Sequence, residues 1–388
     1  MDARDFFGYK NPDEEPERPE GSEEDEDAIP TFEEAITLDG PDVIKRIDAA
    51  DMLGRVHDLP RQLAVARRVA AAVELDRRHR DVDVALVLGM GGSAIGAELA
   101  AGIAGDRLKV PLIVHRDYGL PAWAGERTLV IAASHSGDTV ETLSGATEAR
   151  RRGLPLVVAS TGGALGRQAA TDGTPYLRYE AAGQPRAAIG FGLGLVHELL
   201  VRAELLSDPD PFAPAVGGLE DMLERNAPGV DTDANPAKQL AWAIFGRIPI
   251  VYGAGALTAV AHRWKTQLNE NAKGWAMYEP MPEANHNAIE GTLNPRELSD
   301  ALYVVEVRER EEPEHIAARY RVVEELLGER ATNRSVYWAE GPSRLARTLD
   351  AVAMGDLVSV YLAVLYQTDP TPVTLLAMLK ERLARSTD

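Results

Sequence analysis

Short apolar runs alternate with helix-length segments along most of the chain beyond residue 37. The first run, Val82–Leu88, is followed by glycines and then by small and apolar residues that suit a helix packed closely on a sheet. Three more runs follow, each separated from the next by enough residues for a helix: 110–117, 128–133 and 155–161. This alternation is typical of parallel strands covered by helices, and it predicts a doubly wound α/β sheet.

The same layout recurs after an interruption. Prolines and polar residues break the rhythm over residues 206–236, and a new strand is then expected at Arg247–Tyr252. Glycines and a helix follow this strand as they follow the first, at a fixed offset of 164 residues, which indicates a duplicated unit. The glycines concerned are Gly89 and Gly91 in the first unit and Gly253 and Gly255 in the second.

We therefore expect two α/β domains of one architecture, each a doubly wound parallel sheet of the flavodoxin-like, αβα type. The predicted N-terminal domain covers residues 38–205, the boundary segment covers residues 206–236, and the C-terminal domain covers residues 237–388. The length of 388 residues agrees with this division, because single hydrophobic cores stop growing at roughly 250–300 residues.

Acidic residues are concentrated at the start of the chain. The whole sequence carries a formal charge of −20, and residues 1–34, with 14 acidic and 3 basic side chains, account for −11 of it. Such a segment has too little apolar surface to offset the entropy of ordering, so residues 1–37 are predicted to be a mostly disordered, solvating extension. The negative field repels phosphate backbones and anionic lipid surfaces, and we expect no nucleic acid and no membrane as partner.

The absence of cysteine excludes disulfides, thiol nucleophiles and Cys-ligated zinc or iron–sulfur centres. The N-terminus carries charges where a signal peptide needs an apolar stretch, and no 18 apolar residues follow one another without interruption. A cytoplasmic location is therefore expected.

The glycine turns suggest ligand binding. A strand that ends in a glycine-rich turn opening a helix presents backbone N–H groups and the positive end of the helix dipole, which together bind phosphate. Gly89-x-Gly91-x-x-Ala94 also satisfies the dinucleotide fingerprint, and Asp117 ends the second strand where a ribose-binding acid would stand. Glycines that only make a tight turn are a third interpretation, and the motif alone leaves all three open.

The third strand favours a phosphosugar over a dinucleotide. It is followed by SHSGDTVET, in which Ser134, Ser136 and Thr139 crowd three hydroxyls at the end of a strand just before a helix. Such a group suits the oxygens of one phosphate, whereas a helix cap would need only one hydroxyl. Ser93, in the first glycine turn, is expected on the same rim.

Beyond the acidic extension, the chain resembles the sugar isomerase (SIS) superfamily, and more closely its bifunctional phosphoglucose/phosphomannose isomerase branch. The resemblance rests on GMGGSAIGAE, SHSGDTVET, GQPRAAIGFGLG, KTQLNENAKGWAMYEPMPEANHNAIEG and DPTPVTLLAMLKERL, in that order along the chain. It implies SIS domains that interconvert glucose 6-phosphate or mannose 6-phosphate with fructose 6-phosphate, in a homodimer with its active site at the subunit interface. The residues it implies for phosphate binding are Gly91, Gly92, Ser93, Ser134, Ser136 and Thr139.

The resemblance also implies two residues for the proton transfer itself. Glu270 would move a proton between C1 and C2 of the open-chain sugar through an enediol, a task for which one carboxylate beside both carbons suffices. The alternative for Glu270 is a solvent-facing charge on a helix expected over Ala261–Lys273. Arg186 would hold the negative charge of the enediolate, and its alternative is an ordinary salt bridge.

Two further catalytic residues are implied for the opening of the sugar ring. His286, a residue type suited to acid–base catalysis, would act in the site of the neighbouring subunit. Lys380 would assist from a helix capped by Thr371 and Pro372, and its alternative is a surface lysine that only covers apolar area with its stem.

The chain departs from the family pattern at three positions: His135 stands where tyrosine is usual, Asp138 where asparagine is usual, and Ala288 where glutamate is usual. The histidines are scattered, so no metal and no other cofactor are expected. Two other functions stay open, a non-catalytic phosphosugar-binding regulator and a nicotinamide oxidoreductase that would use the dinucleotide fingerprint.

Overall fold

Two parallel sheets form the framework of the protein. The computed structural model describes residues 37–181, 183–295, 298, 301–328 and 333–386, and the chain from Thr37 onward is one compact unit. One sheet has the strand order β2-β1-β3-β4-β5, and the other has the order β7-β6-β8-β9. The strands are β1 (Val84–Leu88), β2 (Leu112–His115), β3 (Thr128–Ala133), β4 (Leu156–Ser160), β5 (Tyr176–Arg178), β6 (Ile248–Ala254), β7 (Met277–Met281), β8 (Leu302–Glu309) and β9 (Arg334–Ala339).

The two sheets share one topology. In each, the first strand in sequence lies between the second and the third, and the fourth follows the third, which is the flavodoxin-like doubly wound order. The registers agree as well: Leu88 pairs with His115 across β1 and β2, and Tyr252 pairs with Glu279 across β6 and β7, each residue 164 positions after its counterpart. The predicted α/β fold class and the duplicated layout are confirmed.

The predicted domain limits stay a prediction. Each sheet lies within one predicted domain, and the boundary segment 206–236 holds the helix α9, which packs against α13 and α3. The acidic extension, residues 1–37, lies outside the described residues except for Thr37.

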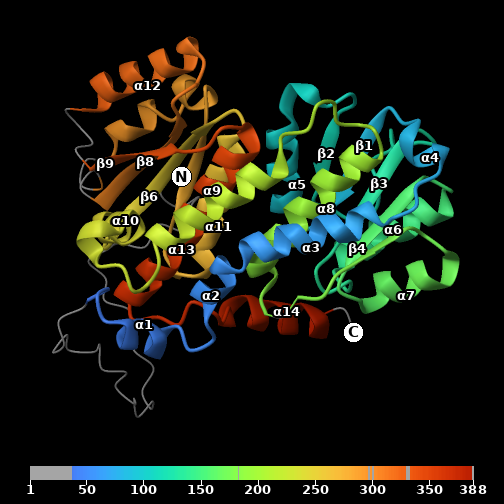
Figure 1. Ribbon diagram of the computed structural model, residues 1–388, viewed down its shortest axis with the longest axis horizontal. Helices are drawn as coiled ribbons and strands as arrows, with labels where there is room; N and C mark the ends of the chain where they lie inside the picture. The colour runs from blue at the N-terminus through green and yellow to red at the C-terminus, as the bar shows by residue number, and fades with distance from the viewer. Residues whose placement is uncertain (1–36, 182, 296–297, 299–300, 329–332, 387–388) are drawn as a thin grey trace, which may run out of the picture. The chain divides into compact units, whose positions relative to one another are not determined.

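Helices connect and cover the strands. They are α1 (Pro41–Ile47), α2 (Met52–His57), α3 (Leu59–Ala71), α4 (Arg77–Arg80), α5 (Gly91–Ala104), α6 (Val140–Arg151), α7 (Gly163–Asp172), α8 (Ile189–Arg202), α9 (Phe212–Arg225), α10 (Pro236–Ile244), α11 (Leu257–Glu270), α12 (Glu314–Leu327), α13 (Arg344–Leu365) and α14 (Thr374–Ser386). Two short 3₁₀ helices matter for the site, η3 (Pro185–Ala188) and η5 (Glu283–His286). Figure 1 shows helices between the two sheets, where α5 packs against α8 and α11, and α11 against α13.

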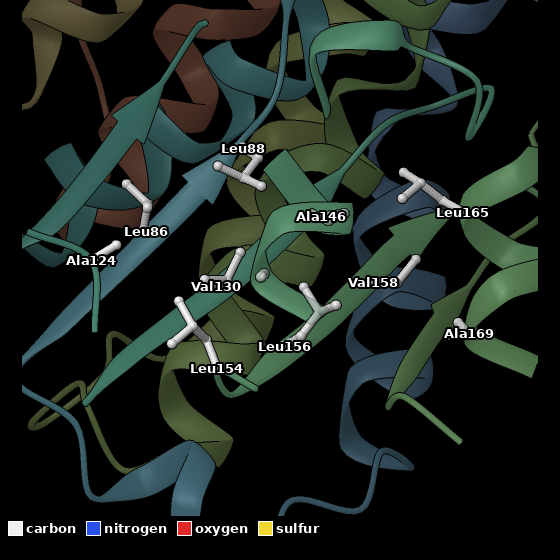
Figure 2. Packing of buried hydrophobic residues seen from close by; sticks show 12 residues of the cluster. Leu86, Leu88, Ala124, Val130, Ala146, Leu154, Leu156, Val158, Leu165 and Ala169 are labelled. Atoms are coloured by element: carbon white, nitrogen blue, oxygen red, sulfur yellow. The ribbon is translucent and has the colours of Figure 1, made fainter. Parts of the chain in front are cut away.

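The hydrophobic core is built by alternate strand residues against small helix residues. On one face of the first sheet, leucines and valines of β1, β3 and β4 meet alanines of α6 and α7 (Figure 2). The members labelled there are Leu86, Leu88, Ala124, Val130, Ala146, Leu154, Leu156, Val158, Leu165 and Ala169. Alanine on these helices lets them approach the sheet closely.

Helix α13 is the central helix of the C-terminal half. By length and composition it could cross a membrane, but this apolar stretch is entirely buried inside the protein. It crosses α11 at close range: a Cβ on Gly355 would overlap the ring of Trp264, whose indole N–H donates to the carbonyl of Ala351 at 2.8 Å. The apolar residues of α13 therefore belong to the hydrophobic core.

Several strand limits differ from the sequence-based expectation; the second strand, for example, covers Leu112–His115 and not the whole of 110–117. The first strand begins at Val84, not Val82, because its ladder with β3 begins at the pair Val84–Thr128. The strand expected to end at Tyr252 continues to Ala254, because its ladder with β7 continues to the pair Ala254–Met281.

Candidate active site

The first glycine turn lies directly against the segment that carries Arg186. Gly91 begins α5 with a φ of +50°, a left-handed conformation that favours glycine. A Cβ on Gly92 would come within 3.0 Å of the carbonyl oxygen of Pro185 and 3.3 Å of the nitrogen of Arg186. Ser93 is partly buried in the first turn of the helix. The turn that is predicted to bind phosphate is therefore in contact with the backbone of the predicted catalytic arginine.

The hydroxyls that follow β3 form a compact loop. The hydroxyls of Ser134 and Thr139 are 2.8 Å apart, and Ser134 also accepts a hydrogen bond from the N–H of Gly137 at 3.1 Å. Ser136 is exposed and accepts from the N–H of Asp138 at 3.2 Å. Thr139 is the N-cap residue of α6, but its hydroxyl makes no capping bond to the helix. The helix-cap alternative thus does not account for these hydroxyls.

The carboxylate of Asp138 is hydrogen-bonded to helix α7. Its Oδ1 accepts a hydrogen bond of 2.8 Å from the N–H of Ala164, at the N-terminus of α7. The loops after β3 and β4 touch here, since a Cβ on Gly137 would overlap the carbonyl oxygen of Gly162. The N–H groups at the start of a helix stabilise a carboxylate. The aspartate at position 138, which departs from the family pattern, is therefore stabilised by the neighbouring helix.

His135, the second residue that departs from the family pattern, lies beside two stacked aromatic rings. Its Nδ1 is 3.3 Å from the hydroxyl of Tyr179, whose ring stacks on Phe191 with centroids 4.7 Å apart. Burial lowers the pKa of His135 below its ordinary value, because the charged imidazolium would be poorly solvated there. The side chain is therefore neutral at neutral pH.

Arg186 is buried, with 3% of its side chain exposed, and its guanidinium joins three parts of the chain. Its Nε donates to the side-chain oxygen of Asn271 at 2.6 Å, and one terminal nitrogen donates to the carbonyls of Pro370 and Thr371 at 2.7 and 2.8 Å. The other terminal nitrogen lies 3.4 Å from Oε2 of Glu270. Burial lowers the pKa of Arg186, and the neighbouring Glu270 opposes that effect.

The backbone of Arg186 is held by a second buried arginine. Arg263 on α11 donates to the carbonyl of Arg186 at 3.0 Å and forms a two-pronged ion pair with Asp356 of α13, at 2.9 and 2.6 Å. Both partners of this pair are buried, since their side chains are 1% and 4% exposed. The segment that carries Arg186 is thereby attached to the helical core.

Glu270 is the last residue of α11, and 29% of its side chain is exposed. The expectation of a helix through Lys273 is wrong: the helix ends at Glu270, because Asn271 turns its side chain into the core and Lys273 has a left-handed φ of +56°. The carboxylate faces Arg186, 84 residues away in sequence. The structure therefore brings Glu270 and Arg186 together.

His286 and Lys380 are both exposed side chains. His286 ends η5, and Lys380 belongs to α14. Within the described part of the chain, no hydrogen bond or ion pair joins either side chain to Glu270 or Arg186. The helix that carries Lys380 begins at Thr374, later than the expected cap, because the carbonyl of Thr371 is already bonded to Arg186.

The third departure, Ala288, packs beside the apolar cluster that includes Tyr252, Met281 and Val304. An alanine fits there without burying a charge. No group of three or more His, Asp or Glu side chains among the described residues is placed to hold a metal ion, and the expectation of a metal-independent reaction stays a prediction.

Sequence reasoning missed three contributors to the site: Asn271, Lys273 and the carbonyl of Pro370, which are joined to Arg186 or Glu270 by hydrogen bonds. Asn271 and Lys273 lie within the segment that carries the resemblance, but no local pattern showed that the helix ends before them. Pro370 contributes only its backbone, which a sequence motif does not reveal.

Comparison with known proteins identifies the class to which this fold and site belong. Residues 233–383 match the family described as the bacterial phospho-glucose isomerase C-terminal SIS domain. A solved structure of a hypothetical protein from Thermus thermophilus superposes with a TM-score of 0.68 at 17% identity, covering 88% of this chain and 94% of that one. The protein is thus built from SIS-type parallel α/β domains.

Relatives at higher identity define the family. A bifunctional phosphoglucose/phosphomannose isomerase of Caldicellulosiruptor bescii is 36% identical over 339 residues, which cover 87% of this chain and 100% of that protein. A protein of the same name from Aquifex aeolicus is 33% identical over 298 residues, or 76% of this chain and 89% of that one. The chain belongs to the bifunctional phosphoglucose/phosphomannose isomerase family.

Proposed function

We propose that the protein is a metal-independent isomerase that interconverts glucose 6-phosphate, mannose 6-phosphate or both with fructose 6-phosphate. The observation that carries the proposal is the pairing of Glu270 with the buried Arg186 at 3.4 Å, beside a glycine turn at the N-terminus of a helix. A carboxylate, a fixed cation and an anion-binding turn are the parts that this reaction needs. The relatives' names support the same activity.

The reaction follows from the chemistry of these groups. Glu270 takes the proton from C1 of open-chain fructose 6-phosphate, and the C–H electron pair forms the C1=C2 bond of an enediolate whose oxygen carries the negative charge. The guanidinium of Arg186 stabilises this charge, and burial increases its effect. Glu270 then returns the proton to C2, where the C1=C2 electron pair forms the new C–H bond. The proton of the C1 hydroxyl passes to the C2 oxygen, and C1 becomes the aldehyde carbon.

Phosphate is proposed to bind between the first glycine turn and the loop after β3. The residues assigned to it are Gly91, Gly92, Ser93, Ser134, Ser136 and Thr139. Gly92 supports this assignment, because it lies against the backbone of Arg186 and links the two parts of the site.

Ring opening is proposed to need a second copy of the chain. His286 would move the proton between the anomeric hydroxyl and the ring oxygen in the partner's site, assisted by Lys380. Two observations support a homodimer. His286 is exposed and, among the described residues, makes no hydrogen bond or ion pair to Glu270. Helix α14 exposes the apolar residues Leu375, Leu376, Met378, Leu379 and Leu383. A cytoplasmic location is proposed on sequence grounds alone.

Isomerisation is tested directly by incubating the protein with fructose 6-phosphate in deuterated water and following the sugar carbons by NMR. The expected result is glucose 6-phosphate, mannose 6-phosphate or both, with deuterium at C2, because the carboxyl proton exchanges with solvent during transfer. Binding without product and without deuterium incorporation would contradict an isomerase and support the phosphosugar-binding regulator, which the relatives' names do not favour.

The dimer is tested by mixing two inactive variants, Glu270→Gln and His286→Asn. If each site takes Glu270 from one chain and His286 from the other, half of the dimers formed after exchange are mixed, and each of these has one intact site. Activity should then return to about one quarter of the wild-type value, as the symmetry of a two-site dimer requires. Two variants that stay inactive after proven exchange would show that both residues serve the same chain's site.

A further inference from the structure

The side chain of Lys273 makes hydrogen bonds at the end of α11 that have no part in the proton transfer described above. Its φ of +56° reverses the chain three residues after Glu270, so the side chain returns to the end of α11. Its Nζ donates to the carbonyl oxygens of Glu270 at 2.6 Å, Asn271 at 3.2 Å and Pro370 at 3.0 Å. An ammonium has three protons, and here each has a carbonyl acceptor.

These three bonds join separate parts of the chain. The carbonyls of Glu270 and Asn271 belong to the end of α11, where backbone oxygens have no partner within the helix. The carbonyl of Pro370 belongs to the connection between α13 and α14, and Arg186 donates to the same oxygen. Glu270 is therefore held twice, by Lys273 at its backbone and by Arg186 at its carboxylate.

The surroundings of Lys273 disfavour its positive charge. The residue as a whole is exposed, yet desolvation of the ammonium, and after it the positive charge of Arg186, lowers the pKa of Lys273 to about 8. The negative charges of Asp369 and Glu270 oppose this shift, and Lys265 lines the same cavity of about 280 Å³ beside α11. A cation kept where its surroundings disfavour it is a feature of functional sites.

We propose that Lys273 is a positioning residue, whose ammonium ties the end of α11 to the backbone of Pro370 and thereby sets the position of Glu270 relative to Arg186. The inference rests on the proposed function, because it gives Lys273 a role only where Glu270 is the base. A neutral amine has two protons and cannot serve three carbonyls. Turnover therefore falls on the alkaline side as Lys273 loses its proton.

The test compares the variants Lys273→Met and Lys273→Arg with the wild type, measuring kcat and KM for fructose 6-phosphate across the pH range. Lys265→Met is the matched control, because it removes a lysine that lines the same cavity but makes no hydrogen bond to these carbonyls among the described residues. Lys273→Met should lower kcat by about ten- to a hundredfold with little change in KM, as expected for a displaced base. The control should change neither constant.

The pH profile distinguishes positioning from general support of the fold. Wild-type kcat should fall above pH about 8, where Lys273 titrates, and Lys273→Arg should keep part of the activity without this fall, because a guanidinium does not titrate there. An alkaline fall that persists in Lys273→Arg, or wild-type kcat in Lys273→Met, would overturn the inference. If Lys273→Met does not fold, the pH dependence of kcat in Lys273→Arg is sufficient to test the inference.

Failure of this inference differs from failure of the proposed function. In the first case the wild type turns over fructose 6-phosphate and Lys273→Met does so equally well. In the second case the wild type itself gives no product, and the role assigned to Lys273 fails with it.

Discussion

The carboxylate of Asp138 accepts a hydrogen bond of 2.8 Å from the N–H of Ala164, at the start of α7. A residue that would repel phosphate in the loop after β3 instead stabilises the neighbouring helix. The departure from the family's usual asparagine is therefore compatible with a phosphate site in the same loop.

The first prediction concerns this contact. Asp138→Ala should destabilise the protein by about 1 kcal/mol, the usual cost of losing a helix N-terminal cap. The affinity for fructose 6-phosphate should not increase, because the carboxylate is already held by the N–H of Ala164. Denaturant unfolding and titration calorimetry measure the two effects. Asp138→Asn, which keeps an acceptor, is the control and should lose less stability; a large gain in affinity in either variant would place the carboxylate near the phosphate.

Gly92 is predicted to be intolerant of a side chain. Gly92→Val should lower kcat by about ten- to a hundredfold, because even a Cβ would stand 3.0 Å from the carbonyl of Pro185 and would displace the backbone of Arg186. Steady-state kinetics together with thermal unfolding separate this effect from misfolding. An unchanged kcat in a folded variant would mean that the glycine turn does not determine the position of Arg186.

The ion pair beneath the site should contribute strongly to stability. Asp356→Ala leaves Arg263 buried without its partner and should cost about 3–5 kcal/mol, measured from the denaturant midpoint. Asp83→Ala removes a partner of Arg127 from an exposed pair at 2.7 Å and should leave the midpoint unchanged. Equal effects of the two substitutions would contradict the role given to the buried pair.

Stability and turnover should respond to alkaline pH in opposite directions. The pKa of Lys273 is about 8 in the folded protein, against an ordinary value of 10.5, so between these values the unfolded chain binds more protons. The free energy of unfolding should therefore rise with pH in this range relative to Lys273→Arg, while kcat falls. Urea unfolding of both proteins between pH about 7.5 and 10 measures the difference. A wild-type stability that falls relative to the variant would show that the pKa is not lowered.

Much of the fold could be predicted because its signals are local. The strands β1, β2, β3, β4 and β6 follow from short apolar runs, whereas β5, β7, β8 and β9 were not predicted; Gly91 and Gly255 mark the turns where α/β units repeat. The limits of the elements were less accurate, since they depend on ladder partners such as Thr128 and Met281 that a linear pattern does not identify.

The site was predictable only in part. Glu270 and Arg186 were found through motifs, but their contact spans 84 positions and arises from the packing of η3 against the end of α11. Lys273 could not be recognised, because its role depends on a left-handed turn and on a backbone carbonyl of Pro370. The places of His286 and Lys380 in a dimer stay a prediction.

The central claim is that Glu270 is the base of an isomerase, and the exchange of the C1 protons of fructose 6-phosphate in deuterated water tests it most directly. The wild type should incorporate deuterium at C1, and Glu270→Gln should do so about a hundred- to ten-thousandfold more slowly while still binding the sugar phosphate by calorimetry. Exchange at the wild-type rate in Glu270→Gln would contradict the account.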